Sequence, residues 1–123
     1  MARILITGGA GYLGGALTDI LQTSDHDVRV YDCLLYEESY RKDVPFVYGD
    51  IRDAEAVAGA VQGVDEVHHL AYINGTEFFY SAPELVLDVG VKGMVNVLDA
   101  CRRHDVGTLI LASSSEVYQH PDR

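Results

Sequence analysis

A glycine-rich segment follows the first apolar run of the chain and has the composition of a phosphate-binding turn. Its glycines fit two spacings, Gly-x-Gly-x-x-Gly from Gly9 and Gly-x-x-Gly-x-x-Gly from Gly8. In such a turn one glycine permits a tight bend, one lets a diphosphate approach the backbone, and one lets a helix pack closely on a strand. A helix that opens there points unpaired backbone N–H groups at the phosphates. The residues expected to hold the diphosphate are Gly8, Gly11, Tyr12, Leu13 and Gly14.

An acidic residue, Asp32, ends the next apolar run, 18 positions after Gly14. A carboxylate at this point is typical of a dinucleotide site, where it accepts hydrogen bonds from ribose hydroxyls. Its charge repels a 2′-phosphate, and Cys33 rather than an arginine follows it, so the sequence favours NAD over NADP. A purely structural glycine turn is the alternative, but the flanking strand, helix and carboxylate favour a cofactor site.

The composition limits the class of partner and the compartment. The 123 residues include 9 Lys and Arg against 19 Asp and Glu, for a formal net charge of −10. A field of that sign repels nucleic acids and anionic membranes. Two cysteines cannot build a disulfide scaffold, and the apolar N-terminal run is too short for a signal peptide or a membrane span. We therefore expect one cytoplasmic domain with free thiols.

The elements that must position these residues alternate along the chain. Strands are predicted where aliphatic and β-branched residues cluster, at residues 3–7, 28–32, 45–48, 66–70 and 108–112. Helices are predicted after the glycine turn, from an Asp53 cap to about Gln62, and from a Ser81 cap to the basic residues 102–104, whereas 72–80 shows no period. Alternation of this kind predicts an α/β fold, a Rossmann-type doubly wound parallel sheet of about five strands.

Four segments, in this order along the chain, are Ile6 to Gly14, Gly49 to Asp53, His69 to Ala71, and Ser113 to Tyr118. Together they resemble the extended short-chain dehydrogenase/reductase family, in particular its nucleotide-sugar epimerases and dehydratases. The resemblance implies an NAD-dependent enzyme that oxidises a sugar carbon and then epimerises, dehydrates or decarboxylates the keto-sugar. The whole chain would be the NAD-binding Rossmann domain of such an enzyme, and members of the family commonly form homodimers.

The resemblance also implies roles for residues outside the glycine turn. Asp50 would accept a hydrogen bond from the adenine amino group, and Ile51 would add a backbone contact. Leu70, Ala71 and Tyr72 would line the phosphate and ribose near the nicotinamide.

The serine cluster carries the implied catalytic residues. Ser114 matches the family's catalytic Ser/Thr, which hydrogen-bonds the sugar hydroxyl that is oxidised. Ser115 and Glu116 match the pair that shapes or performs the later acid–base step. Glu116 resembles a feature of dehydratases or decarboxylases, but epimerases vary at that position, so it does not decide between these reactions.

The sequence departs from the family at two points that bear on function. No tyrosine has a lysine four residues later, so the catalytic Tyr-x-x-x-Lys is absent before Arg123, and we expect a truncated chain. Gly90 stands where many relatives carry Asn. A non-catalytic NAD-sensing domain and a reductase of non-sugar alcohols or ketones are therefore the alternatives to a nucleotide-sugar enzyme. No metal is expected, because the adjacent His68 and His69 of a strand point to opposite faces.

Overall fold

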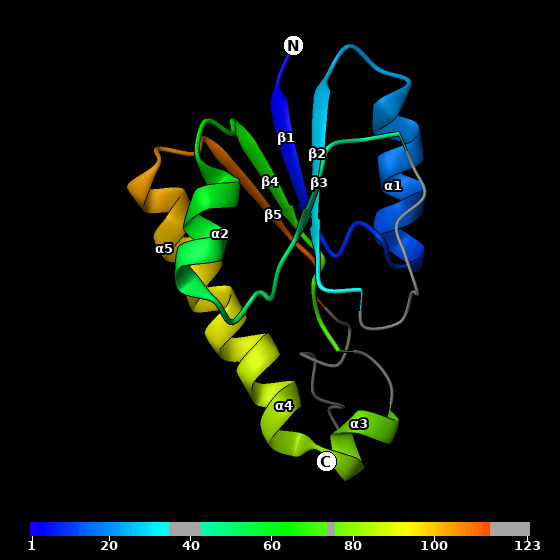
Figure 1. Cartoon of the computed structure of the whole chain (residues 1–123), viewed down its shortest axis with the longest axis vertical. Coiled ribbons are helices and arrows are strands. Elements are labelled where there is room, and N and C mark those ends of the chain that lie inside the picture. Colours follow the sequence, from blue (N-terminus) through cyan, green and yellow to red (C-terminus); the bar gives the residue numbers. More distant parts are fainter. Residues whose placement is uncertain (35–42, 74–75, 114–123) are drawn as a thin grey trace, which may run out of the picture.

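Five parallel strands form a single sheet in the computed structural model, which describes residues 1–34, 43–73 and 76–113 (Figure 1). The strands are β1 (Arg3–Thr7), β2 (Asp27–Asp32), β3 (Phe46–Tyr48), β4 (Glu66–His69) and β5 (Thr108–Leu111). Their order is β3-β2-β1-β4-β5. From the central strand β1 the chain first adds β2 and β3 on one side, and it then crosses over to add β4 and β5 on the other side. The predicted Rossmann-type doubly wound sheet is confirmed, and its topological switch point lies at β1 and β4.

Helices cover both faces of the sheet. Figure 1 shows α1 (Tyr12–Gln22) on one face, and α2 (Ala54–Val61) and α5 (Gly93–Arg103) side by side on the other. Side chains of β1 alternate between these faces. Leu5 packs in the core beneath α2 and α5, whereas Ile4 and Ile6 belong to a smaller core that includes Leu17 of α1. The continuous apolar run of β1 therefore reflects burial on both sides.

The long helix predicted after residue 81 contains a π-helical turn. α4 (Pro83–Leu87), the π-helical η1 (Asp88–Lys92) and α5 follow one another directly, and the N–H of Gly93 bonds the carbonyl of Asp88 five residues earlier. Gly90 lies inside this turn, and no heavy atom of the described residues lies within 4 Å of the position its Cβ would take. Gly90 therefore does not serve a close backbone contact in the described part of the chain.

The start of this helix differs from the prediction. Ala82 is the N-cap, with Pro83 in the first turn as expected. Ser81 instead ends the short helix α3 (Thr76–Ser81), where its hydroxyl donates to the Glu77 carbonyl at 2.8 Å. The predictions of a Ser81 cap and of an aperiodic segment through Tyr80 are therefore wrong. A helix of six residues spans fewer than two turns, too few for a periodic apolar pattern to appear.

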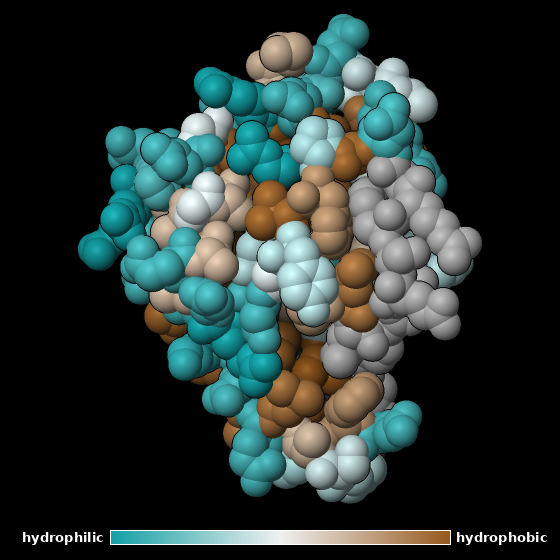
Figure 2. Space-filling model, in the orientation of Figure 1, coloured by the Kyte–Doolittle hydropathy of each residue, from teal (hydrophilic) through white to brown (hydrophobic). Residues whose placement is uncertain are grey.

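The surface view shows apolar side chains gathered below the carboxyl ends of the strands, above α3 and α4 (Figure 2). A second apolar set lies on the outer side of the long helix, where the side chains are 48–62% exposed. Its members, at helical spacing, are Leu87, Val91, Val95 and Leu98. Among the described residues, no helix combines the length and the apolar composition needed to cross a membrane.

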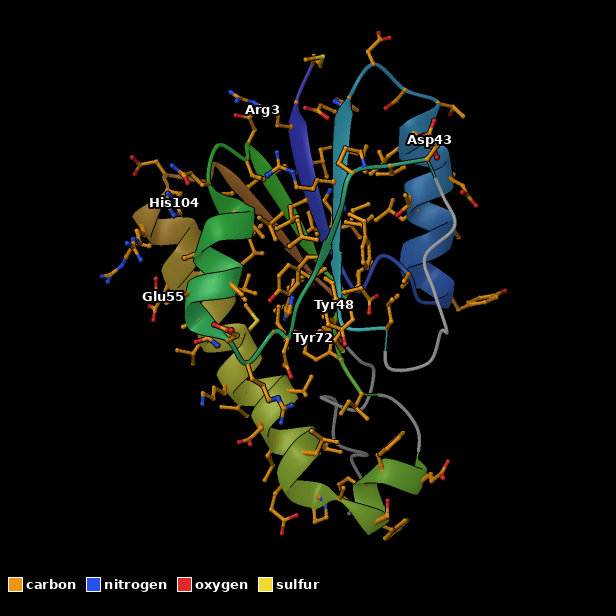
Figure 3. The ribbon with its side chains drawn as sticks, viewed as in Figure 1. Arg3, Asp43, Tyr48, Glu55, Tyr72 and His104 are labelled. Carbon is orange, nitrogen blue, oxygen red and sulfur yellow. The ribbon has the colours of Figure 1, made fainter. Side chains whose placement is uncertain are left out.

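The strand register brings distant parts of the sequence to one edge of the sheet. Thr7 pairs with Tyr31 on β2 and with His69 on β4, and Asp32 pairs with Tyr48 on β3. Figure 3 shows Tyr48 and Tyr72 at this edge, with Arg3 at the opposite end of the sheet. Ligands of doubly wound sheets bind at the edge where the strands finish.

Candidate cofactor-binding site

The glycine turn joins the end of β1 to α1, and its glycines pack closely against neighbouring backbone and side-chain atoms. Gly8 has a left-handed φ of +73°, and a Cβ there would lie 2.8 Å from the carbonyl oxygen of Leu70. A Cβ on Gly14 would overlap the Gly8 carbonyl, and one on Gly9 would lie 2.6 Å from the Val30 side chain. Only glycine fits at these positions, because the turn, the first helical turn and the neighbouring strands approach so closely.

The first turn of α1 presents backbone N–H groups at this edge. Gly11 is the N-cap, so the amides of Tyr12, Leu13 and Gly14 have no acceptor within the helix. The Tyr12 and Leu13 side chains are 98% and 62% exposed, and the first turn contains no acidic residue that would repel an anion. Unpaired amides of this kind, together with the helix dipole, favour an anion at the N-terminus of α1.

Asp32 holds the turn from the side of β2. Its Oδ2 accepts from the Ala10 N–H at 3.0 Å, and its Oδ1 accepts from the Leu34 N–H at 2.8 Å. A carboxylate has about four lone-pair sites, so each oxygen retains one for a further donor. Asp32 can thus accept two ribose hydroxyls while it fixes the glycine turn.

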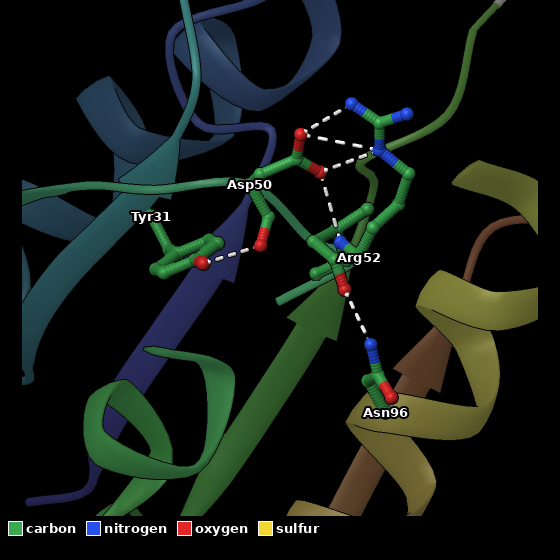
Figure 4. Close-up of polar contacts among 5 residues, drawn as sticks. Tyr31, Asp50, Arg52 and Asn96 are labelled. Carbon is green, nitrogen blue, oxygen red and sulfur yellow. Dashed lines mark hydrogen bonds and ion pairs between the residues drawn. The ribbon is translucent and has the colours of Figure 1, made fainter. Parts of the chain in front are cut away.

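The segment that leaves β3 forms the next part of this edge (Figure 4). Tyr31 donates its hydroxyl to the Asp50 carbonyl at 2.6 Å, and Asn96 of α5 donates to the Ile51 carbonyl at 3.0 Å. The Asp50 carboxylate accepts from the Arg52 guanidinium through Nη2 at 2.6 Å and through Nε at 3.0 and 3.1 Å. It also accepts the Arg52 backbone N–H at 2.9 Å.

These contacts fix the ionisation of two side chains. Hydrogen bonds from the Arg52 side chain lower the pKa of the Asp50 carboxyl, so Asp50 is an anion and an acceptor at neutral pH. Burial, with the Asp53 and Asp50 charges, raises the pKa of the Tyr31 phenol, which therefore stays protonated and donates. Each Asp50 carboxylate oxygen receives two contacts from Arg52, so its acceptor sites are already occupied in this structure. Acceptance of the adenine amino group by Asp50 stays a prediction.

The exit of β4 is tied to β1 through the Thr7 hydroxyl. Thr7 Oγ1 accepts from the Leu70 N–H at 3.0 Å and from the Ala71 N–H at 3.2 Å, and it lies 2.7 Å from His69 Nδ1. A hydroxyl has two acceptor sites and one hydrogen, so its proton points to His69 Nδ1. The bonds place the Leu70–Ala71 backbone against Gly8. That Leu70, Ala71 and Tyr72 line a cofactor stays a prediction.

His69 is a buried neutral histidine in this arrangement. Burial lowers its pKa to about 4, and its Nε2 has no hydrogen-bond partner among the described residues. Its ring lies 4.9 Å from the ring of Tyr72, whose hydroxyl contacts the Met94 sulfur at 3.6 Å. Burial also raises the pKa of Tyr72, so this phenol is not a base at neutral pH.

Other sequence predictions fall outside this edge or outside the described residues. Ser114, Ser115 and Glu116 lie beyond the described ranges. His68 contacts Glu66 at 2.7 Å, whereas His69 contacts Thr7, so the two histidines have separate partners. Within residues 1–34, 43–73 and 76–113 there is no group of three potential metal-ligating side chains.

Four residues of the site were not selected from the sequence for the roles they have here. They are Thr7, Arg52, His69 and Asn96. Arg52 could have been found, because a basic residue two positions after an acidic one in a turn can fold back on it. Asn96 had a weaker signal, a polar residue on the inner side of an amphipathic helix. The contact of Thr7 with His69 joins residues 62 positions apart and had no local signal.

Comparison with known proteins gives a consistent assignment. The NAD dependent epimerase/dehydratase family matches residues 4–123. A 2-alkyl-3-oxoalkanoate reductase from Stenotrophomonas maltophilia is 36% identical over 115 residues, which are 94% of this chain and 34% of that protein. UDP-glucuronic acid decarboxylase 1 from Danio rerio is 34% identical over 125 residues, covering 98% of this chain and 29% of that protein.

The fold has close structural counterparts with bound cofactor. The crystal structure of UDP-glucose 4-epimerase from Thermus thermophilus, in complex with NAD, superposes with a TM-score of 0.84 at 34% identity. The match covers 91% of this chain and 37% of the epimerase, so the chain spans about a third of the length of these relatives. The predictions of an extended short-chain dehydrogenase/reductase and of NAD as its cofactor are confirmed.

Proposed function

The chain belongs to the NAD-dependent epimerase/dehydratase family, and we propose that it forms the NAD-binding Rossmann domain of an enzyme that acts on a nucleotide sugar. NAD supplies a hydride acceptor for oxidation of a sugar carbon, and the resulting keto-sugar is epimerised, dehydrated or decarboxylated. The observation that carries the proposal is the bond between the Asp32 carboxylate and Ala10 of the glycine turn. It assembles a phosphate site and a ribose site in one rigid unit.

Different residues of the described structure bind different parts of NAD. The α1 amides bind the diphosphate, and Gly8 and Gly14 keep side chains out of its way. Asp32 accepts the hydroxyls of the adenosine ribose. The Leu70–Ala71 backbone, fixed by Thr7, lines the part of the site that leads toward the nicotinamide.

The catalytic residues are proposed from the family resemblance. The Ser114 hydroxyl hydrogen-bonds the sugar hydroxyl that loses hydride, and Ser115 and Glu116 serve the later acid–base step. The family's tyrosine base with its lysine is not among the 8 tyrosines of this sequence. We therefore expect these 123 residues to turn over no substrate on their own.

A second candidate function is reduction of a carbonyl compound that is not a sugar. The observation that favours it is the 36% identity to a protein named 2-alkyl-3-oxoalkanoate reductase. The two candidates are separated by thermal unfolding of the NAD-loaded chain with UDP-glucose or with a 3-oxoalkanoate. A higher midpoint with UDP-glucose alone supports the nucleotide-sugar enzyme, and a higher midpoint with the 3-oxoalkanoate alone supports the reductase.

We also propose that the chain forms a homodimer through the outer side of the long helix. The support is the stripe of Leu87, Val91, Val95 and Leu98, which is exposed in the single chain. Sedimentation velocity tests this proposal: Val95→Glu should convert a dimer to a monomer, and a monomeric wild-type chain would contradict it.

The cofactor assignment is tested through Asp32. Calorimetric titration should show that Asp32→Ala weakens NAD by about tenfold to a hundredfold, the value of two charge-assisted hydrogen bonds, and weakens NADP much less. The difference arises because the carboxylate binds ribose hydroxyls but repels a 2′-phosphate. Asp99→Ala, an exposed substitution on α5 with the same change of charge, is the control and should leave both affinities unchanged. Equal losses for NAD and NADP would contradict the role of Asp32 in cofactor selection.

A further inference from the structure

We propose that the guanidinium of Arg52, held flat by the Asp50 carboxylate, binds the adenine ring of the cofactor by stacking against it. The inference rests on the proposed function of the glycine turn and Asp32 as the NAD site. It assigns a base-binding role to a side chain that stood in the sequence only as part of a turn.

The guanidinium is fixed in one orientation. Arg52 Nε and Nη2 both bond the Asp50 carboxylate, with the shortest distance at 2.6 Å, and the Arg52 backbone N–H bonds the same carboxylate at 2.9 Å. A fork of this kind holds guanidinium and carboxylate close to one plane. The faces of the guanidinium and its Nη1 group are not used by these bonds, and the side chain is 37% exposed.

The segment that carries Arg52 is anchored on three sides. Tyr31 of β2 bonds the Asp50 carbonyl, Asn96 of α5 bonds the Ile51 carbonyl, and Asp53 caps α2 by accepting the Ala56 N–H at 3.1 Å. The Asp50 carbonyl also accepts the Asp53 N–H at 3.0 Å. The carbonyls of Asp50 and Ile51 therefore already have donors, and the guanidinium is the largest planar group that this segment offers to a ligand.

Arg52 lies where a base attached to the ribose would pass. Asp32 pairs with Tyr48 in the strand register, and the Gly49 N–H bonds the Asp32 carbonyl at 3.1 Å. Asp50 and Arg52 follow directly. A nucleoside whose ribose hydroxyls bind Asp32 has its diphosphate at α1, so its base extends over the exit of β3 rather than back toward the turn.

The charge and hydration of Arg52 suit an uncharged aromatic base. Its charge is balanced by Asp50, so an adenine ring meets an ion pair rather than an isolated cation. Guanidinium is weakly hydrated and stacks on aromatic faces, whereas an ammonium group is strongly hydrated and has no flat face. This difference makes Lys an informative replacement for Arg52.

The experiment compares AMP, which has the base, with nicotinamide mononucleotide, which lacks adenine. Calorimetric titrations use the full chain, wild type and with Arg52→Lys, Arg52→Ala or, as a control, Arg103→Ala at the exposed end of α5. We expect both Arg52 variants to bind AMP and NAD about fivefold more weakly, equivalent to about 1 kcal/mol. Nicotinamide mononucleotide should change by less than about twofold, and Arg103→Ala should match the wild type for all three ligands.

Each of the other outcomes would contradict a specific part of the proposal. Unchanged AMP affinity in Arg52→Ala removes any contact with the base, and full AMP affinity in Arg52→Lys shows that charge rather than stacking is responsible. Equal losses for AMP and nicotinamide mononucleotide show that Arg52 acts only by supporting the fold, which thermal unfolding of the variants reports separately. If the wild-type chain binds none of the three ligands, the proposed function itself fails; if it binds them and the variants bind equally well, only the role of Arg52 fails.

Discussion

Replacement of the buried His69 by glutamine should remove much of the acid sensitivity of the fold. The Thr7 hydroxyl accepts two backbone N–H groups and gives its proton to His69 Nδ1. Protonation of Nδ1 would leave the hydroxyl hydrogen without an acceptor and would place a charge at a fully buried position. In the folded state the His69 imidazole therefore stays neutral, whereas in the unfolded chain it takes up a proton at the ordinary pKa of histidine.

The size of the effect follows from the change in pKa. Burial lowers the pKa of His69 from 6.5 to about 4. Between these values the unfolded state binds more protons than the folded state, so the free energy of unfolding falls as the pH falls. At about 1.36 kcal/mol for each pKa unit, the full loss reaches about 3 kcal/mol once the pH is below both values. As the pH rises above 6.5 this contribution fades, because the unfolded chain also loses its proton.

The assay is urea unfolding followed by far-UV circular dichroism, from about pH 7.5 to about pH 4.5. Carboxylates contribute to the pH dependence of every variant, so the informative quantity is the difference between wild type and His69→Gln. We expect His69→Gln to be less stable at neutral pH but to lose about 2 to 3 kcal/mol less on acidification. Parallel pH profiles for wild type and His69→Gln would refute the assignment of a neutral, buried His69.

Replacement of a glycine by alanine should weaken NAD binding at Gly14 but raise the stability of the fold at Gly59. Gly14→Ala places a methyl group on the Gly8 carbonyl, so calorimetry should show NAD binding weakened by at least about tenfold, with retained secondary structure. Gly59→Ala in α2 meets no heavy atom of the described residues within 4 Å, so urea unfolding should show a gain of about 0.5–1 kcal/mol with NAD affinity unchanged. Equal NAD affinity in both variants would contradict the close approach of turn and helix, and a loss of stability in Gly59→Ala would contradict the open environment of that helix face.

The parts of the structure that depend on local sequence were predictable. Strand β1 could be located because Ile4, Leu5 and Ile6 are all apolar, as burial on both faces requires. The cap of α2 could be located because Asp53 has a side chain that accepts the Ala56 N–H three residues later. The parallel sheet with helices on both faces could be predicted from the alternation of strands and helices, whereas the strand order β3-β2-β1-β4-β5 comes from the structure.

The parts that depend on distant contacts were not predictable. Asn96 reaches the Ile51 carbonyl across 45 residues, and Thr7 reaches His69 across 62. Nothing near Asn96 or Thr7 in the sequence marks them as partners of those groups. The Ser81 cap was wrong for a related reason: a Ser before a Pro is a good start signal for a helix, but the preceding α3 already uses the Ser81 hydroxyl.

The same distant contacts explain how a ligand site can be rigid before a ligand binds. Each strand exit is tied to a neighbouring segment: Asp32 to Ala10, Asp50 to Tyr31, and the Leu70–Ala71 backbone to Thr7. None of these bonds uses the α1 amides or the last lone pairs of Asp32, which stay available for phosphate and ribose. Ordering of these groups therefore belongs to the free energy of folding rather than to that of binding, and preorganisation of this kind raises affinity without added contact area. A substitution that cuts one tie should weaken NAD binding even where the altered side chain never touches the cofactor.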